Sequence, residues 1–154
     1  MKARAGVLTL AVCLAAVAAC FADDLSSGTW KLNEAKSHLG AGITKNSTVT
    51  YEPAGDSVKI TLDGTDAAGN PTHIVWTGKF DGKDYPVTGG APSEVRSVRQ
   101  INSRTLVTRV KREGKVIIST RIVLSPDGKS RVVTSTATNA QGQKVKSVAY
   151  YDKQ

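Results

Sequence analysis

The residue types that most often act as nucleophiles, bases or metal ligands are scarce in this chain. It has only two histidines, His38 and His73, and only two cysteines, Cys13 and Cys20. Neither histidine has a partner at the spacing of a zinc site or a catalytic triad, and a lone histidine on a strand is more often a wall or surface residue. The sequence therefore predicts no catalytic residue, no metal site and no cofactor, and it favours a protein that is not an enzyme.

Two groups of oxygen-bearing side chains are better explained as turns. Asp63, Asp66 and Asn70 are residue types that bind calcium, but they lack the ligand spacing of a calcium loop. In the segment FDGKDYPV, Asp81 and Asp84 either form a functional acidic patch or belong to an ordinary Asp-Gly hairpin. Turn chemistry accounts for both groups.

The elements that hold these residues are predicted to be strands, because apolar and polar residues alternate from Ser47 onward. Val58, Ile60 and Leu62, for example, lie on one face of such a strand. Turn signals with glycine separate the alternating segments, and helical spacing is not convincing anywhere. With further strands near 29–33, 94–101 and 104–112, the count reaches about eight to ten. We expect an all-β antiparallel meander closed into a barrel, because an open meander would leave two unpaired edges.

Gly28-Thr29-Trp30, at the start of the first expected strand, resembles the G-x-W signature of lipocalins. In that family the tryptophan plugs the closed end of the barrel and a basic side chain from a late strand packs over its ring. The resemblance therefore implies a structural role for Trp30; Lys144 and Lys146 are the basic candidates in the final strand.

A wider similarity covers nearly all of the chain after residue 22. The segments GTWKLN, YEPAGD, TGKFDGKDYPVTG and NAQGQ are similar to segments of small bacterial secreted proteins of lipocalin-like (calycin) type. Members of that group mostly lack an assigned activity. The resemblance implies a lipocalin-like β-barrel and supplies no catalytic residues.

Three residues are candidates for the wall of a ligand cavity inside this barrel. Tyr51 lies on one strand face with Val49, and Ile74 and Trp76 share another. An apolar concave surface with one or two aromatic rings is the usual lining of a small-molecule site. The alternative is a fully packed core without a cavity.

Arg99 interrupts the expected inward face of its strand, which also holds Val95 and Ile101. If its side chain points inward, it is a buried cation that needs an anionic partner, such as the carboxylate of a fatty acid. The alternative is a bulge that turns Arg99 outward beside Arg96. The first interpretation makes Arg99 a ligand-binding residue.

The first 22 residues have the pattern of an export signal peptide. Lys2 and Arg4 precede an apolar run that is too short, at about 14 residues, to span a bilayer. Cleavage before Asp23 is one route; the other follows a lipoprotein-like VAAC box and leaves an acylated Cys20 as a membrane anchor. Residues 23–154 then form a single barrel domain in the periplasm or outside the cell.

The chain is basic, with a formal net charge of +8 at pH 7. Its basic residues recur at alternating strand positions, such as Lys59, Arg109 and Arg121, which indicates a solvated outer face rather than a nucleic-acid site. We expect no nucleic-acid partner and membrane contact only through an anchor at Cys20, while the oligomeric state stays open.

Two functions fit this pattern. The first is an exported, non-catalytic lipocalin-like protein that binds a small apolar or amphipathic molecule inside the barrel. The second is a packed barrel that acts as an envelope interaction or inhibitor module through its loops. The volume of the interior distinguishes them.

Intact-mass analysis of protein from the native host tests the leader. The expected product begins either at Asp23 or at an acylated Cys20. Retention of the whole leader would contradict both routes.

Overall fold

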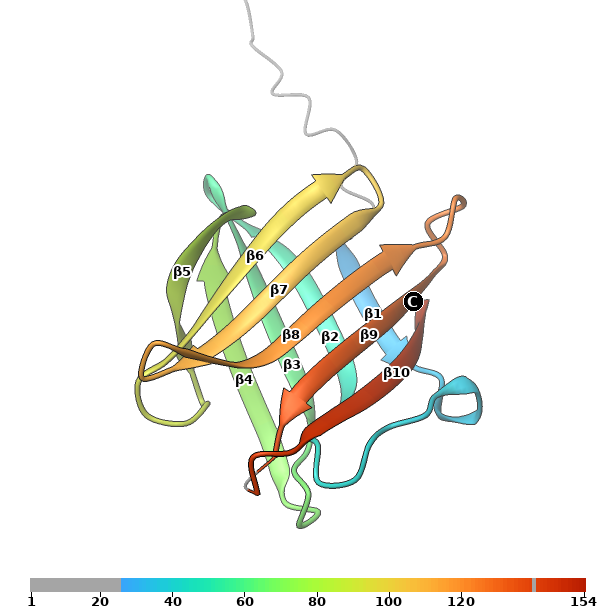
Figure 1. The fold of residues 1–154 in the computed structure, drawn as a ribbon. Coiled ribbons are helices and arrows are strands. Elements are labelled where there is room, and N and C mark those ends of the chain that lie inside the picture. The colour runs from blue at the N-terminus through green and yellow to red at the C-terminus, as the bar shows by residue number, and fades with distance from the viewer. Residues whose placement is uncertain (1–25, 140) are drawn as a thin grey trace, which may run out of the picture.

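The computed structural model describes residues 26–139 and 141–154, so the expected leader and Cys20 lie outside the described residues. Within these ranges ten antiparallel strands close into a barrel (Figure 1). The strands are β1 (Gly28–Leu32), β2 (Lys45–Ala54), β3 (Ser57–Thr65), β4 (Pro71–Gly78), β5 (Asp81–Thr88), β6 (Glu94–Asn102), β7 (Thr105–Arg112), β8 (Lys115–Leu124), β9 (Ser130–Thr138) and β10 (Lys144–Lys153). The prediction of an all-β antiparallel barrel is confirmed.

Each strand pairs with its neighbours in sequence, and β1 pairs with β10 to complete the ring. Closure aligns Trp30 with Lys153 and Lys31 with Asp152. Next to this ladder, the Asn33 side chain donates a 2.8 Å hydrogen bond to the Asp152 carboxylate. Closure pairs the first strand with the last, so neither β1 nor β10 is left as an open edge.

Tight turns hold the hairpins where the sequence supplies residues that tolerate a positive φ. Glu113 and Gly114, between β7 and β8, have φ values of 51° and 76°. A two-residue turn of this kind matches the twist of the flanking strands. Apart from these hairpin turns, a short 3-10 helix (Glu34–Lys36) lies between β1 and β2. In the described ranges no helix is long and apolar enough to cross a membrane.

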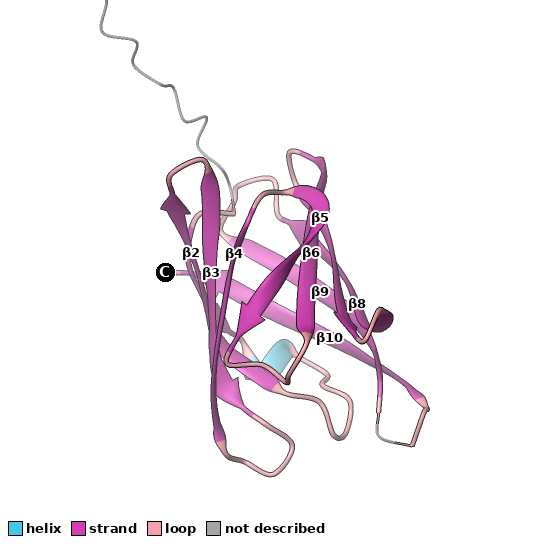
Figure 2. Ribbon diagram, turned by 90° about the vertical axis from the view of Figure 1, so that its left-hand side faces the viewer, coloured by secondary structure: helices cyan, strands magenta, loops and turns pink. Residues whose placement is uncertain are grey.

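The ladder between β4 and β5 is short, since only Val75 with Thr88 and Trp76 with Val87 are in register. Figure 2 views the barrel from the side of these strands. Aromatic packing supplements the short ladder: the Trp76 ring lies 6.4 Å from that of Phe80 and meets that of Tyr85 edge-on at 5.8 Å. These rings fill the space beside the short ladder with apolar contact.

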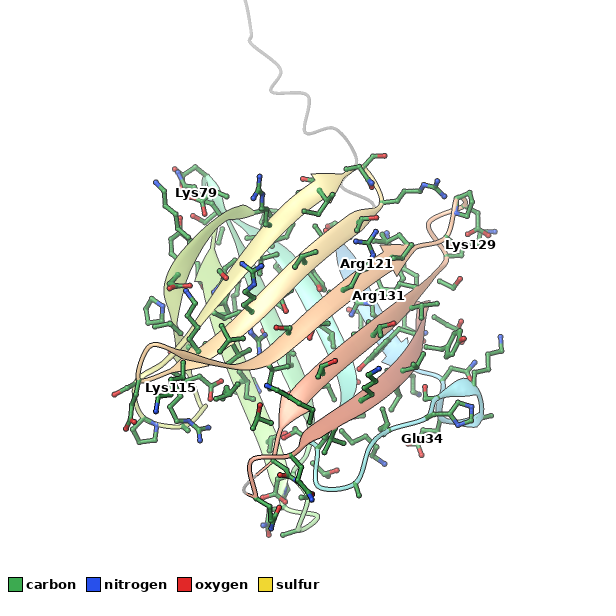
Figure 3. All side chains as sticks on the ribbon, in the orientation of Figure 1. Glu34, Lys79, Lys115, Arg121, Lys129 and Arg131 are labelled. Atoms are coloured by element: carbon green, nitrogen blue, oxygen red, sulfur yellow. The ribbon has the colours of Figure 1, made fainter. Side chains whose placement is uncertain are left out.

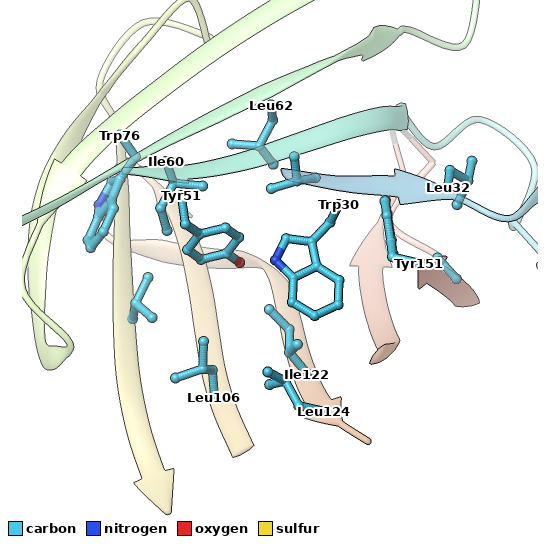
Figure 4. Packing of buried hydrophobic residues seen from close by; sticks show 13 residues of the cluster. Trp30, Leu32, Tyr51, Ile60, Leu62, Trp76, Leu106, Ile122, Leu124 and Tyr151 are labelled. Atoms are coloured by element: carbon cyan, nitrogen blue, oxygen red, sulfur yellow. The ribbon is translucent and has the colours of Figure 1, made fainter. Parts of the chain in front are cut away.

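Trp30 lies fully buried inside one end of the barrel, between Tyr51 and Tyr151 (Figure 4). Its Nε1 donates a 2.8 Å hydrogen bond to the Ser26 carbonyl oxygen. The guanidinium of Arg131, on β9, lies 4.6 Å from the ring centroid. A second cation, Lys153 Nζ on β10, lies 5.5 Å away.

The basic side chains over Trp30 are therefore Arg131 and Lys153, and not Lys144 or Lys146. The last two precede the middle of β10 and are exposed. A cation over the tryptophan, which the resemblance implied, is present, but it comes from residues other than the two named from the sequence.

Replacing Trp30 with alanine is expected to lower the free energy of unfolding by about 3–5 kcal/mol, because it removes a large buried aromatic side chain and leaves a cavity. Denaturant titration measures the change. Val123→Ala, at an exposed position of β8, is the control and should change stability by less than about 0.5 kcal/mol. An equal effect of the two substitutions would remove the structural role of Trp30.

Candidate ligand-binding cavity

The barrel encloses a cavity of about 660 Å³. Strands β2–β4 and β6–β10 form its wall. Residues of the connecting segments, such as Leu39, Gly90 and Asn139, lie at the end of the cavity opposite Trp30. Pockets for small molecules commonly have volumes of about 300–1,000 Å³. The interior is therefore large enough for a small molecule.

One wall of the cavity is mainly apolar, although Asn46 and Thr72 also line it. Val49, Ile60, Leu62 and Ile74, from β2, β3 and β4, line it together with the ring of Tyr51. The adjacent strands place them side by side, with Val49 opposite Leu62 and Leu62 opposite Ile74. Tyr51 and Ile74 therefore lie where the sequence predicted, although their role in binding stays a prediction.

Trp76 does not line the cavity. Its ring is fully buried in the aromatic group with Phe80 and Tyr85, and its Nε1 donates a 2.9 Å hydrogen bond to the Arg96 carbonyl oxygen. The alternation of β4 correctly places Trp76 on the inner side. Packing at the end of the strand, which alternation does not reveal, separates it from the open volume.

The predicted inward orientation of Arg99 is wrong. Its side chain is exposed, while Glu94, Arg96 and Val98 of the same strand line the cavity. Both faces of β6 carry apolar residues. The face with Ile101 was predicted to point inward, but Ile101 is 49% exposed. The bulge alternative correctly turned Arg99 outward, but Arg96 does not lie beside it: Arg96 is the inward cation.

Arg96 has unused hydrogen-bonding capacity in the cavity. Its Nε is buried and has no partner within the described parts of the chain. Desolvation lowers the pKa of the Arg96 guanidinium, and Tyr51 and Glu94 act in the opposite direction. An arginine nevertheless keeps its charge in proteins. A buried N–H without an acceptor is unfavourable, so an anionic group that entered the cavity would be stabilised here.

Glu94, which lies on the same strand as Arg96, forms its ion pair with Arg112. Its Oε2 accepts a 3.4 Å hydrogen bond from Nη2 of Arg112, at the β6–β7 side of the cavity. The Glu94 side chain is largely buried and that of Arg112 is half exposed. This ion pair leaves the Nε of Arg96 open to another acceptor.

Arg131 forms the end of the cavity next to Trp30, and only 2% of its surface is exposed. Besides Trp30, its guanidinium lies 5.1 Å from the ring centroid of Tyr51 and 4.9 Å from that of Tyr151. Its Nε and Nη1 have no hydrogen-bond partner in the described ranges. The three rings stabilise this cation, which sequence reasoning missed because no local pattern connects β9 with Trp30.

Tyr151 is the tyrosine most affected by this environment. Burial raises the pKa of its phenol from 10.0 to about 12, although the charge of Arg131 acts in the opposite direction. The phenol donates a 2.8 Å hydrogen bond to the Asn46 carbonyl oxygen, which bridges β10 and β2. The protonated phenol is therefore part of the closed end.

The other polar residues considered in the sequence lie on the outside or in turns. His73 Nδ1 and Asp63 Oδ1 are 2.6 Å apart on the exposed surface. Asp66 accepts hydrogen bonds from the backbone of Ala68 and Asn70, and Asp81 accepts one from Lys83. The described residues contain no group of three or more histidine, cysteine or acidic side chains placed to hold a metal ion.

Charged side chains are spread around the exterior. Lys79, Lys115 and Lys129 lie at three different turns or strand ends, and Arg121 lies on the outer face of β8 (Figure 3). Several basic side chains have acidic partners, such as Lys111 with Asp84 at 2.7 Å. The exterior therefore shows the dispersed charge of a solvated surface.

The molecule is a closed antiparallel β-barrel with an internal cavity. No protein-family model matches the chain, and no curated protein matches it. Among solved structures, a redesigned β-barrel, mFAP1, bound to DFHBI matches with 14% sequence identity, over 84% of this chain and 95% of that chain, at a TM-score of 0.38. This distant similarity carries no argument about function.

The stability of the protein should fall as the pH rises from about 10 to about 12, because the folded state keeps the Tyr151 proton that the unfolded state releases. Below pH 10 this contribution is fully present. Denaturant titrations across this range should show a smaller loss in Tyr151→Phe than in the wild type or in Tyr150→Phe, the matched control. The same pH slope in all three proteins would contradict the assignment.

Proposed function

We propose that the protein is an exported carrier that binds a small amphipathic molecule with an anionic head group and does not transform it. The observation that carries this proposal is Arg96, a cavity-lining cation whose buried Nε has no partner in the described chain. A carboxylate supplies both a countercharge and a hydrogen-bond acceptor at that atom. The apolar wall of β2–β4 suits the rest of such a ligand.

Arg96 is a better anchor for the head group than Arg131. The guanidinium of Arg131 already lies against the rings of Trp30, Tyr51 and Tyr151. No ring of the described residues packs in this way on Arg96, although Glu94 interacts with its charge. We therefore assign the ligand-binding role proposed for Arg99 to Arg96.

The size of the interior favours a carrier over the packed interaction or inhibitor module. A packed barrel fills its centre with side chains, whereas this one encloses about 660 Å³. Export is proposed from the leader alone, and a membrane anchor requires the lipoprotein route at Cys20.

The carrier proposal is tested with oleic acid and other long-chain acids. At a free acid concentration 100-fold above the dissociation constant, binding to the folded state alone raises the free energy of unfolding by about 2.7 kcal/mol. We expect a clear rise in melting temperature for the wild type and for Arg99→Gln, and a much smaller rise for Arg96→Gln. Arg99→Gln is the matched control, since it removes an exposed arginine from the same strand.

Mass spectrometry of a lipid extract from natively purified protein identifies the natural ligand. An empty extract together with no stabilisation by any acid would overturn the carrier proposal. Equal stabilisation of the wild type and Arg96→Gln would leave a carrier but remove Arg96 as its anchor.

A further inference from the structure

The wall of the cavity formed by β7–β10 carries a row of hydroxyl groups. Thr108 is opposite Thr120, Thr120 is opposite Ser135, and Ser135 is opposite Ser147. All four residues line the cavity. One hydroxyl therefore comes from each of four adjacent strands at the same level of the barrel, which we call the hydroxyl row.

Apolar residues border the hydroxyl row on both sides. The neighbouring level toward the plug contains Ile122, Val133 and Ala149, in register on β8, β9 and β10. The neighbouring level on the other side contains Ile118, Ala137 and Val145. The polar groups of the hydroxyl row thus form a band between two apolar levels of this wall.

This band has more hydrogen-bond donors than the protein uses. The Thr108 hydroxyl has no hydrogen-bond partner among the described residues. Thr120 and Ser135 share one hydrogen bond of 3.1 Å, which uses only one of their two O–H groups. Ser147 Oγ accepts a 2.9 Å hydrogen bond from the Gly40 backbone, which leaves its own O–H group without an acceptor there.

The unused donors determine which ligand fits best. Water can satisfy hydroxyls in an empty cavity, but a plain hydrocarbon chain would displace that water and leave the O–H groups unpaired. A ligand with an oxygen at this level replaces the lost hydrogen bonds. On the opposite wall, Val49, Leu62 and Ile74 require no such group on the ligand's other edge. Two atoms elsewhere on that wall, Asn46 Oδ1 and Thr72 Oγ1, are also buried without a hydrogen-bond partner among the described residues.

We infer that the hydroxyl row selects an oxygenated amphipathic acid, one that carries a hydroxyl or carbonyl oxygen partway along its apolar body in addition to its anionic head group. This inference rests on the proposed carrier function and narrows its ligand class. The oxygen faces β7–β10, and the apolar edge of the ligand faces Val49, Leu62 and Ile74.

Binding of stearic acid and of its positional series of hydroxystearic and ketostearic acids, measured by calorimetry, tests the inference. The series moves the oxygen along the chain, so its spacing from the head group does not have to be known in advance. We expect a maximum at one or two adjacent positions, where the oxygenated acid binds about three- to tenfold more tightly than stearic acid.

The double substitution Thr108→Val and Thr120→Val keeps the shape of the side chains and removes two hydroxyls. It should abolish the preference for oxygenated acids while stearic acid binds at least as tightly as before. Thr134→Val, an exposed threonine on the outer face of β9, is the matched control and should keep the preference.

The outcomes separate this inference from the carrier proposal. If stearic acid binds and no oxygenated acid binds more tightly, the inference is overturned and the carrier proposal stands. If a preference exists but the double substitution leaves it unchanged, the hydroxyl row is not its source and the inference is again overturned. If no acid of the series binds, both proposals fail.

Discussion

Arg131 extends from β9 into the closed end of the barrel, where its guanidinium lies 4.6–5.1 Å from the ring centroids of Trp30, Tyr51 and Tyr151. These rings belong to β1, β2 and β10, so one side chain connects four strands around the place where the barrel closes. A buried cation is unfavourable without compensation, and the electron-rich ring faces provide it. The cluster also sets the inner limit of the cavity, since Arg131 lines the cavity and Trp30 does not.

The fold was predictable because it depends on local patterns. Alternation and glycine turns act within a few residues, and they predicted the antiparallel strands of the barrel. The structural position of Trp30 followed from the resemblance of Gly28-Thr29-Trp30 to the lipocalin signature. The direction of Arg99 was not predictable in this way, because both faces of β6 carry apolar residues. Register shifts flank the segment, between Asp81 and Asp84 and between Gln100 and Asn102. Contacts with neighbouring strands therefore decide that Arg96, and not Arg99, points inward.

The sequence also could not predict whether the barrel contains a cavity, because the interior volume depends on the sizes of side chains from strands far apart in the chain. Tyr51 and the aliphatic residues of β2–β4 present large side chains, whereas Thr120, Ser135 and Ala149 on the opposite wall are small. A threonine or serine in a strand is equally compatible with an outer face, so its inward position cannot be read locally. The β2–β4 side of the interior is consequently mainly apolar, the β7–β10 side carries the hydroxyl row, and Arg131 lies at the end next to Trp30.

The order of the strands around the ring has a consequence for how the chain folds. Every ladder except β1–β10 joins strands that are consecutive in the sequence, so these ladders can form as hairpins with little loss of loop entropy. Closure of the ring costs more loop entropy, because β1 and β10 are far apart in the sequence: the Asn33–Asp152 hydrogen bond beside them joins residues 119 positions apart. In the folding of this barrel, the non-local step is therefore the joining of the two ends of the meander, and the aromatic cluster around Arg131 forms at that same junction.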